Sequence, residues 1–330
     1  MTGAATLARS MADGPVVLDG GLATLLEAHG HDLSSELWSA RLLLEAPGAI
    51  GAAHREYFEA GAQVAITASY QASLPGFAAI GVGRADAERA LRRSVELARE
   101  AAGAASNGAG PGRRAARSDR DASSAPDRWV AASIGPYGAA LADGSEYRGD
   151  YGLTERQLRD WHRPRLEILA DAGADLFAVE TIPCLAEASA LLAEIERLDV
   201  PAWLSLTCDH GRTRAGEPAG EAFAMAAEVD QVLAVGVNCV ESAQAADLVA
   251  QAAETSGKPA VVYPNSGEVW DAAGRRWGGR STFGPEHAAV WVASGARLVG
   301  GCCRVGPDAI RQLARSAPGW PKGPGSVSSR

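Results

Sequence analysis

The stretch LFAVETIP, residues 176–183, begins with four consecutive apolar residues and then turns polar at Glu180 and Thr181. A short continuous apolar run is typical of a strand that is buried on both faces of a parallel sheet. Seven further runs have the same character, and each is followed by a segment with helical periodicity. They are VVLDGG (16–21), VAITASY (64–70), WVAASIGP (129–136), AWLSLTC (202–208), AVGVNC (234–239), AVVYPNSG (260–267) and LVGGCC (298–303).

The segments between these runs read as amphipathic helices. Residues 154–173 start at Thr154, a suitable N-cap, and end at Gly173, and residues 85–103 behave in the same way. Eight repeats of strand and helix in 330 residues are typical of a (β/α)8 TIM-type barrel. We therefore predict a single-domain α/β barrel over residues 15–316, with a doubly wound sheet as the alternative.

Three segments lack the apolar pattern of the barrel. Residues 104–127 are rich in Gly, Ser, Pro, Asp and Arg, so we expect a mobile insertion between the second helix and the third strand. We expect residues 1–14 to be frayed and residues 317–330 to form a loose tail. None of these segments is expected to carry function.

The overall composition favours small-molecule chemistry. The chain has 31 basic and 40 acidic residues and a net charge of -9, and it lacks a basic patch interleaved with aromatic residues, so we expect no nucleic-acid partner. No apolar run approaches the roughly 20 residues of a membrane span, and the N-terminus lacks the apolar segment of a signal peptide. We expect a cytoplasmic protein without a membrane partner, of unknown oligomeric state.

The carboxyl ends of the strands carry most of the chemically versatile residues. In a barrel of this kind the active site lies at these ends, where the loops after the strands meet. The sixth and eighth runs end in cysteines, and these two strands are next-but-one neighbours in a closed barrel. Side chains from both can therefore surround one opening. The cysteines concerned are Cys239, Cys302 and Cys303.

Three cysteines at one opening predict a metal site. Three thiolates suit Zn2+, and three protein ligands with an open fourth position are typical of a catalytic zinc site. Gly300 and Gly301 would let the backbone turn, so that both vicinal cysteines can point to the same ion. The alternative is that all three are small buried core residues. The chain has five cysteines, an odd number that is unsuited to a disulfide framework, and its six histidines show no ligand pattern.

Several of these segments together resemble the zinc-dependent homocysteine S-methyltransferases. The matching segments lie in order along nearly the whole domain: LDGGLATLLEAHGHDLSSELWSA (18–40), ITASYQAS (66–73), IGPYGAALADGSEYRGDY (134–151), ETIP (180–183), GVNC (236–239), YPNSGEVWD (263–271) and GGCCR (300–304). The segments at 142–151 and 263–271 look like the branch that uses S-methylmethionine or S-adenosylmethionine as donor. The betaine-using branch has a tyrosine directly after the glutamate that matches Glu180, whereas this chain has Thr181. Cobalamin-dependent methionine synthases need further modules, for which the chain is too short.

The resemblance implies methyl transfer from a sulfonium donor to homocysteine on a zinc site formed by Cys239, Cys302 and Cys303, without an organic cofactor. By the same resemblance, Asp19 and Glu180 match the positions that bind the ammonium group of homocysteine. The backbone at Gly20 and Gly21 and the hydroxyl of Thr67 are expected to take its carboxylate, and Asn238 to orient Cys239 or touch substrate. Weaker expectations for donor contacts are Tyr70, Tyr137, Glu146, Asp150 and Trp270.

Two other functions stay open from the sequence. A barrel could use its thiols for redox chemistry or peroxide sensing without any methyl donor. A binding protein with structural zinc would instead have a closed fourth ligand position. The sequence also leaves open which donor, including betaine, and which thiol acceptor are used.

Overall fold

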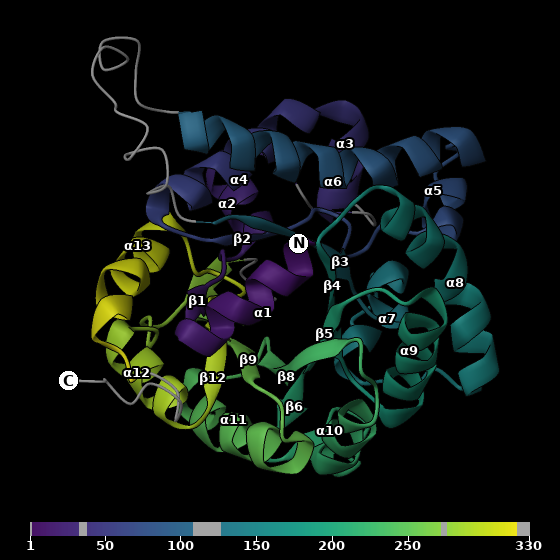
Figure 1. Cartoon of the computed structure of the whole chain (residues 1–330). Helices are drawn as coiled ribbons and strands as arrows, with labels where there is room; N and C mark the ends of the chain where they lie inside the picture. Colours follow the sequence, from purple (N-terminus) through teal and green to yellow (C-terminus); the bar gives the residue numbers. More distant parts are fainter. Residues whose placement is uncertain (1, 33–37, 108–126, 272–275, 322–330) are drawn as a thin grey trace.

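The computed structural model describes residues 2–32, 38–107, 127–271 and 276–321. Strands alternate with helices along the chain (Figure 1). The strands are β1 (Val16–Val17), β2 (Val64–Ile66), β3 (Trp129–Ile134), β4 (Leu176–Ile182), β5 (Ala202–Leu206), β6 (Cys208–Asp209), β7 (Arg212–Thr213), β8 (Val232–Asn238), β9 (Ala260–Tyr263), β10 (Val269–Asp271), β11 (Arg276–Gly278) and β12 (Ala296–Val299).

The helices lie outside the ring of strands, with the exception of the first (Figure 1). They are α1 (Gly3–Asp13), α2 (Leu22–Ala28), α3 (Trp38–Glu45), α4 (Pro47–Ala60), α5 (Leu74–Ala79), α6 (Arg84–Asn107), α7 (Tyr137–Leu141), α8 (Glu155–Asp171), α9 (Leu185–Leu198), α10 (Ala219–Ala227), α11 (Ser242–Ser256), α12 (Pro285–Ala293) and α13 (Pro307–Ser316), with short 3-10 turns η1 (Ser145–Tyr147) and η2 (Ala317–Gly319).

Eight strands form one parallel sheet that closes on itself. Their order is β1-β12-β9-β8-β5-β4-β3-β2, and each adjacent pair is parallel. A parallel bridge between Leu18 and Val64 joins the two ends of this order, and the Asp19 N–H donates to the Val64 carbonyl at 3.1 Å. The predicted barrel is therefore confirmed, and all eight predicted runs contribute a strand to it. A doubly wound sheet, which stays open, is excluded.

The period-two alternation of the strands divides the core into two layers. Trp129 and Ala131 of β3 face the barrel interior, whereas Val130, Ala132 and Ile134 pack outward against the helices. The other strands alternate in the same way. Apolar residues therefore fill the interior at the amino ends of the strands, and the inward positions farther along each strand are left for the site.

Helix α1 corrects the expectation that residues 1–14 are frayed. Its apolar face, with Ala4, Leu7 and Met11, is buried, and the latter two pack into the interior cluster of the barrel. Thr6 accepts a hydrogen bond from the indole N–H of Trp129 at 2.9 Å, which fixes the helix to β3. Figure 1 shows α1 lying across the ring of strands.

The other two segments differ partly from expectation. Helix α6 extends to Asn107, so residues 104–107 of the predicted insertion are helical, and residues 108–126 lie outside the described part of the chain. The predicted tail begins with η2, after which Trp320 is only 6% exposed. Residues 322–330 are also outside the described residues.

Candidate active site

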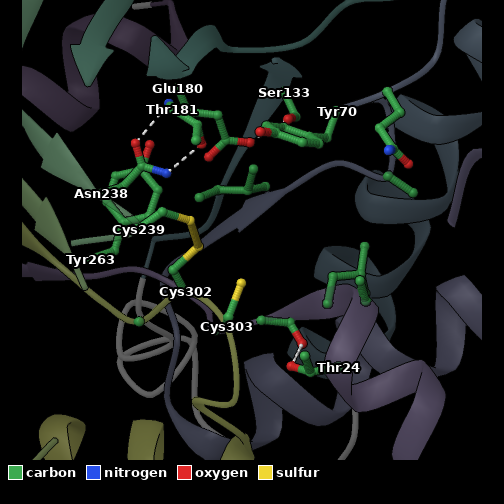
Figure 2. Close-up of a pocket in the computed structure, with 18 of the residues that line it drawn as sticks. Thr24, Tyr70, Ser133, Glu180, Thr181, Asn238, Cys239, Tyr263, Cys302 and Cys303 are labelled. Atoms are coloured by element: carbon green, nitrogen blue, oxygen red, sulfur yellow. Dashed lines mark hydrogen bonds between the residues drawn. A yellow bond between two sulfur atoms is a disulfide. The ribbon is translucent and has the colours of Figure 1, made fainter. Parts of the chain in front are cut away.

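A pocket of about 130 Å³ opens where the carboxyl ends of the strands meet. Its wall comes from β2, β3, β4, β8 and β9, from the segments that follow β1 and β12, and from η1. Figure 2 shows the three predicted cysteines on one side of this pocket and Glu180, Thr181, Ser133 and Tyr70 on another. Of the predicted substrate residues, Gly20, Gly21, Thr67, Glu180 and Asn238 line the pocket.

The three predicted metal ligands come together. The sulfur atoms of Cys239, Cys302 and Cys303 all lie within 4.8 Å of one another, although Cys239 and Cys302 are 63 positions apart in the chain. Cys239 and Cys302 are joined as a disulfide with a Cα–Cα distance of 5.7 Å, and Cys303 is a free thiol directly beside them (Figure 2). Burial raises the pKa of the Cys303 thiol to about 11.

The backbone around the cysteines is held by the end of β9. The N–H of Cys302 donates to the carbonyl of Pro264 at 2.8 Å, and the N–H of Cys303 donates to the side-chain oxygen of Asn265 at 3.1 Å. Cys239 has φ +50°, a left-handed conformation that non-glycine residues rarely adopt. Backbone strain of this kind persists only where surrounding contacts enforce it, and it is often found at functional sites.

The glycines of this region allow close packing. A Cβ atom on Gly20 would lie 2.1 Å from the carbonyl oxygen of Val305, and one on Gly21 would lie 2.5 Å from that of Cys302. A Cβ on Gly300 would lie 2.6 Å from the Cβ of Leu18. The segment 300–305, which contains Cys302 and Cys303, therefore packs directly on the residues that follow β1. Gly21 also donates its N–H to the Val305 carbonyl at 3.0 Å, so this group is not available to a substrate carboxylate.

Glu180 is a buried carboxylate in the pocket wall. It lies on the inward register of β4, two residues beyond Ala178, and accepts a hydrogen bond from the hydroxyl of Ser133 on the neighbouring strand. Tyr263, whose hydroxyl accepts from the indole of Trp203 at 3.0 Å, also hydrogen-bonds to Glu180. Burial raises the pKa of Glu180 to about 7, although both hydrogen bonds act to lower it.

Asp19 is a second buried carboxylate close to the first. It is 1% exposed, and one carboxylate oxygen accepts from the Ile66 N–H at 2.8 Å, whereas Oδ1 has no hydrogen-bond partner. Burial raises the pKa of Asp19 well above its ordinary value, and the charge of Glu180 adds to this shift. Two carboxylates that interact in this way favour a cationic ligand, which would relieve both the burial and the repulsion, although Asp19 is not among the residues that line the pocket.

The hydroxyl of Thr67 is already committed within the protein. It accepts from the N–H of Ser133 at 3.1 Å and lies 2.7 Å from the hydroxyl of Ser69. Because Ser69 donates its own proton to the Ser133 carbonyl, Thr67 must donate to Ser69. Thr67 therefore has no proton left for a substrate carboxylate in this arrangement, and its contacts join β2 to β3.

Asn238 holds the backbone after Glu180. Its side-chain oxygen accepts from the N–H of Thr181 at 2.7 Å and from the hydroxyl of Ser205 at 2.8 Å, and its amide donates to the Thr181 hydroxyl at 2.7 Å. Thr181 has φ +61°, another left-handed non-glycine residue. Asn238 thus fixes the turn that presents Glu180, while the next residue, Cys239, belongs to the cysteine cluster.

Sequence reasoning missed several residues that support this site. Ser133, Ser205 and Tyr263 each lie two residues beyond an inward apolar residue of the same strand, so period-two counting from Ala131, Trp203 and Val261 would have found them. Of the weaker donor expectations, Tyr70 and Glu146 line the pocket, as does Tyr147, which was not expected. Tyr137 packs instead against Tyr151 and Trp161, Asp150 forms an ion pair with Arg148, and the side chain of Trp270 lies outside the described part.

Comparison with known proteins fits this geometry. A family model described as homocysteine S-methyltransferase matches residues 16–317, which include every strand of the barrel and all three clustered cysteines. The chain belongs to the homocysteine S-methyltransferase family. The predicted resemblance is therefore confirmed.

Individual homocysteine S-methyltransferases match over almost their full length. Homocysteine S-methyltransferase 4 of Zea mays is 45% identical over 316 residues, covering 92% of this chain and 90% of the maize protein. Homocysteine S-methyltransferase YbgG of Bacillus subtilis (strain 168) is 41% identical over 304 residues, covering 91% and 93%. The metallated form of the homocysteine methyltransferase MmuM from Escherichia coli superimposes with a TM-score of 0.79 at 40% identity, covering 92% of this chain and 96% of that one.

The cysteine cluster of this homocysteine S-methyltransferase can hold a metal ion. Tetrahedral zinc with three thiolate ligands needs sulfur atoms about 3.8 Å apart, and the three sulfurs here all lie within 4.8 Å of one another. The disulfide occupies two of the three sulfurs, so only the reduced cluster offers all three ligands. Among the described helices, none combines the length and the apolar character that crossing a membrane requires.

Proposed function

We propose that this protein transfers a methyl group from a sulfonium donor, S-methylmethionine or S-adenosylmethionine, to the thiol of L-homocysteine and so forms methionine. One observation carries the proposal: three cysteine sulfurs from two distant segments lie within 4.8 Å of one another, in the wall of a pocket that also contains Glu180. Membership of the homocysteine S-methyltransferase family supports the same reaction.

Cys239, Cys302 and Cys303 would hold Zn2+ once they are reduced. A bound zinc ion lowers the pKa of a coordinating thiol, which is about 8.5 when free, and so keeps an acceptor thiol in its nucleophilic thiolate form at neutral pH. Three thiolate ligands give the site a net negative charge, which leaves the acceptor sulfur electron-rich. The three cysteines lie on one side of the pocket and Glu180 on another, so an acceptor beside the cysteines also faces Glu180 (Figure 2).

Glu180 and Asp19 would bind the ammonium group of homocysteine. Both carboxylates are buried, and Oδ1 of Asp19 is without a hydrogen-bond partner, so an ammonium ion would satisfy an otherwise unpaired group. Ser133 and Tyr263 fix the position of Glu180, and Asn238 fixes the turn that follows it. These contacts orient the amino-acid end of the acceptor and leave its sulfur at the cysteines. The backbone near Gly20 remains the proposed contact for the acceptor carboxylate.

The transfer itself needs no proton donor from the protein. The acceptor sulfur attacks the methyl carbon, the new S–C bond forms as the donor S–CH3 bond breaks, and the bonding pair stays on the donor sulfur, which leaves as a neutral thioether. The acceptor thiol has already released its proton to solvent. Catalysis then rests on alignment of the two sulfur atoms on either side of the methyl group, which the pocket walls would provide.

An assay of zinc-loaded, reduced protein with homocysteine and each donor in turn tests this function. Methionine should accumulate with S-methylmethionine or S-adenosylmethionine, and turnover should cease when zinc is removed by a chelator. Absence of methionine with both sulfonium donors from protein that carries zinc would overturn the proposal. Turnover with betaine alone would assign the chain to the betaine-dependent reaction, which the presence of Thr181 argues against.

Replacing any ligand cysteine should remove the metal. We expect Cys303→Ala to lower zinc from about one ion per chain to a small fraction and to abolish methionine formation, because two thiolates bind zinc much less tightly than three. Elemental analysis of protein purified under reducing conditions measures this. The matched control is Cys208→Ala, a buried cysteine outside the cluster, which should keep both metal and activity. A Cys303→Ala protein with a full zinc complement would contradict the ligand assignment.

The disulfide between Cys239 and Cys302 favours one alternative function, a barrel that uses these thiols for redox chemistry. That function predicts protein without zinc even under reducing conditions, and thiol–disulfide exchange without methionine formation. Metal analysis before and after reduction separates the two functions. Methyl transfer predicts that reduction restores the capacity to bind zinc and that oxidation expels it.

A further inference from the structure

Glu146 is a buried acidic residue in the pocket wall that the reaction described above does not use. It lies in η1, is 7% exposed, and lines the same pocket as the clustered cysteines. Its Oε2 atom is buried and has no hydrogen-bond partner. Burial raises the pKa of this carboxylate, against a smaller opposing effect of the Arg148 charge.

The loop around Glu146 is fixed independently of its carboxylate. The N–H of Ser145 donates to Asp143 at 2.9 Å, and the N–H of Gly149 donates to the Ser145 carbonyl at 3.0 Å. A Cβ on Gly138 would lie 2.5 Å from the backbone nitrogen of Glu146, so η1 packs directly onto α7. The Glu146 side chain is thus held in the wall by the backbone, and nothing in these contacts requires its charge.

The basic residues near this loop have other partners. Arg148 pairs with Asp143 and Asp150, which are both exposed, and the guanidinium of Arg214 lies 5.8 Å from the ring centre of Tyr147. Among the described residues that line the pocket there is no Lys, Arg or His. Glu146 therefore adds a negative charge to a cavity whose wall supplies no positive side chain.

An unpaired buried carboxylate costs folding free energy, so its natural partner is a cation that arrives from outside. Glu180 and Asp19 already account for the ammonium group of the acceptor. The donors differ in net charge: a sulfonium amino acid carries two positive groups and one carboxylate, for a net charge of +1 by its chemistry, whereas betaine is neutral overall. A pocket with an extra acid and no base favours the former.

We propose that Glu146 is a specificity-determining residue that binds the positive charge of the methyl donor and selects sulfonium amino acids over neutral donors such as betaine. This inference rests on the proposed function and assigns a donor contact to η1. The acceptor contacts belong to the segment that follows β1 and to β4, so the two substrates are recognised by separate acids. In this assignment Glu146 contacts the donor, while Glu180 and Asp19 contact homocysteine.

The test compares Glu146→Gln with Asp171→Asn, which removes an exposed charge from the outer helix α8, away from the pocket. With zinc-loaded, reduced protein, Glu146→Gln should raise the KM for S-methylmethionine by about tenfold or more, the usual order for loss of a charge-assisted contact, and change the KM for homocysteine by less than about twofold. Asp171→Asn should change neither value. Equal donor KM values in the wild type and Glu146→Gln would overturn the inference.

Two further measurements keep the test decisive. Thermal unfolding of Glu146→Gln should show a melting temperature equal to or above that of the wild type, because the buried charge is removed and the shape is kept. Glu146→Asp retains the charge and should give a donor KM between those of the wild type and Glu146→Gln. An Asp variant as impaired as the Gln variant would indicate a role of shape alone and overturn the proposal.

Failure of the proposed function would be recognised separately. If the wild type forms no methionine with any donor, the methyl-transfer proposal fails. Calorimetric titration with S-methylmethionine still examines Glu146 in that case. Tight binding by the wild type with weakened binding by Glu146→Gln would support the donor contact, and equal binding by both would overturn it.

Discussion

Glu180 reaches the pocket because the alternation of β4 continues past its apolar half. Leu176, Ala178 and Glu180 share one face, and the first two fill the barrel interior. The third position therefore carries a charge into a site that is already dehydrated, which is why the pKa of Glu180 rises to about 7. The same position next to Ser133 and Tyr263 gives the carboxylate a fixed direction.

The raised pKa of Glu180 predicts that the affinity for methionine depends on pH. Methionine is a suitable probe because it has the ammonium group of homocysteine but no ionisable thiol. A carboxylate with a raised pKa is charged above that pKa, so affinity should be full above pH 7 and fall as the pH drops through about 7, by up to about tenfold per pH unit. Calorimetric titration between pH 5.5 and 8.5 measures it. In Glu180→Gln the affinity should be lower and the part of its pH dependence that comes from this proton should disappear.

Individual residues also mark the limit of prediction from sequence. Cys239, Cys302, Cys303 and Glu180 were found because they follow apolar runs, and strand ends share one rim in this fold. The hydrogen bonds of Thr67 to Ser69 and Ser133 could not be predicted, because the sequence does not show which group a hydroxyl will bind. Likewise, the bonds of Asn238 to Thr181 join positions 57 apart in the chain.

At the scale of elements, helices α8 and α9 are joined by a cluster of charges. The Glu194 side chain is fully buried, and it accepts hydrogen bonds from Arg159, Arg163 and Arg197 at 2.7–3.0 Å. These hydrogen bonds lower the pKa of Glu194 to about 2, against the opposing effect of its burial. The three guanidinium groups remain partly exposed, so solvent screens their attraction to Glu194.

We expect Glu194→Gln to lower the free energy of unfolding by about 1–3 kcal/mol at pH 7. A depressed pKa contributes stability that is present above the unfolded value and lost as the pH falls toward the folded value. The difference between wild type and variant should thus shrink from about pH 4.3 to about pH 2. Urea unfolding across this range checks the expectation. If the difference in unfolding free energy were as large at pH 2.5 as at pH 7, the stabilisation would come from the shape of Glu194 and not from its charge.

The elements themselves were largely predictable. All eight barrel strands appear where apolar runs were found, because burial on both faces is visible in local composition. The hairpins β6–β7 and β10–β11 were not predicted, since strands of two or three residues show no measurable periodicity. Three helices, α2, α3 and α4, separate β1 from β2, and apolar periodicity alone does not divide that stretch.

At the scale of the whole molecule, α1 precedes the strand–helix repeats, yet its buried side chains complete the core inside the barrel. Its pattern of Ala4, Leu7 and Met11 is helical, but the surface that it covers belongs to strands far along the chain. Local sequence gave no sign of that surface, and so a buried helix was expected to be frayed. The buried Trp320, beyond α13, was missed for the same reason.

Truncating the buried face of α1 should destabilise the barrel without changing its chemistry. Leu7 is fully buried, so Leu7→Ala should lower the free energy of unfolding by about 3 kcal/mol, whereas the exposed Ala12→Ser should cost about 0.5 kcal/mol. Denaturant unfolding measures both. Methionine affinity at 25 °C should be retained in each variant, because the helix lies across the amino end and the pocket is at the other. A loss of affinity in Leu7→Ala would mean that the two ends are coupled.

Helix α1 covers one end of the barrel, and the pocket opens only toward the other end. Both substrates must therefore enter, and both products must leave, through the opening of the pocket that the cysteines, Glu146 and Glu180 line.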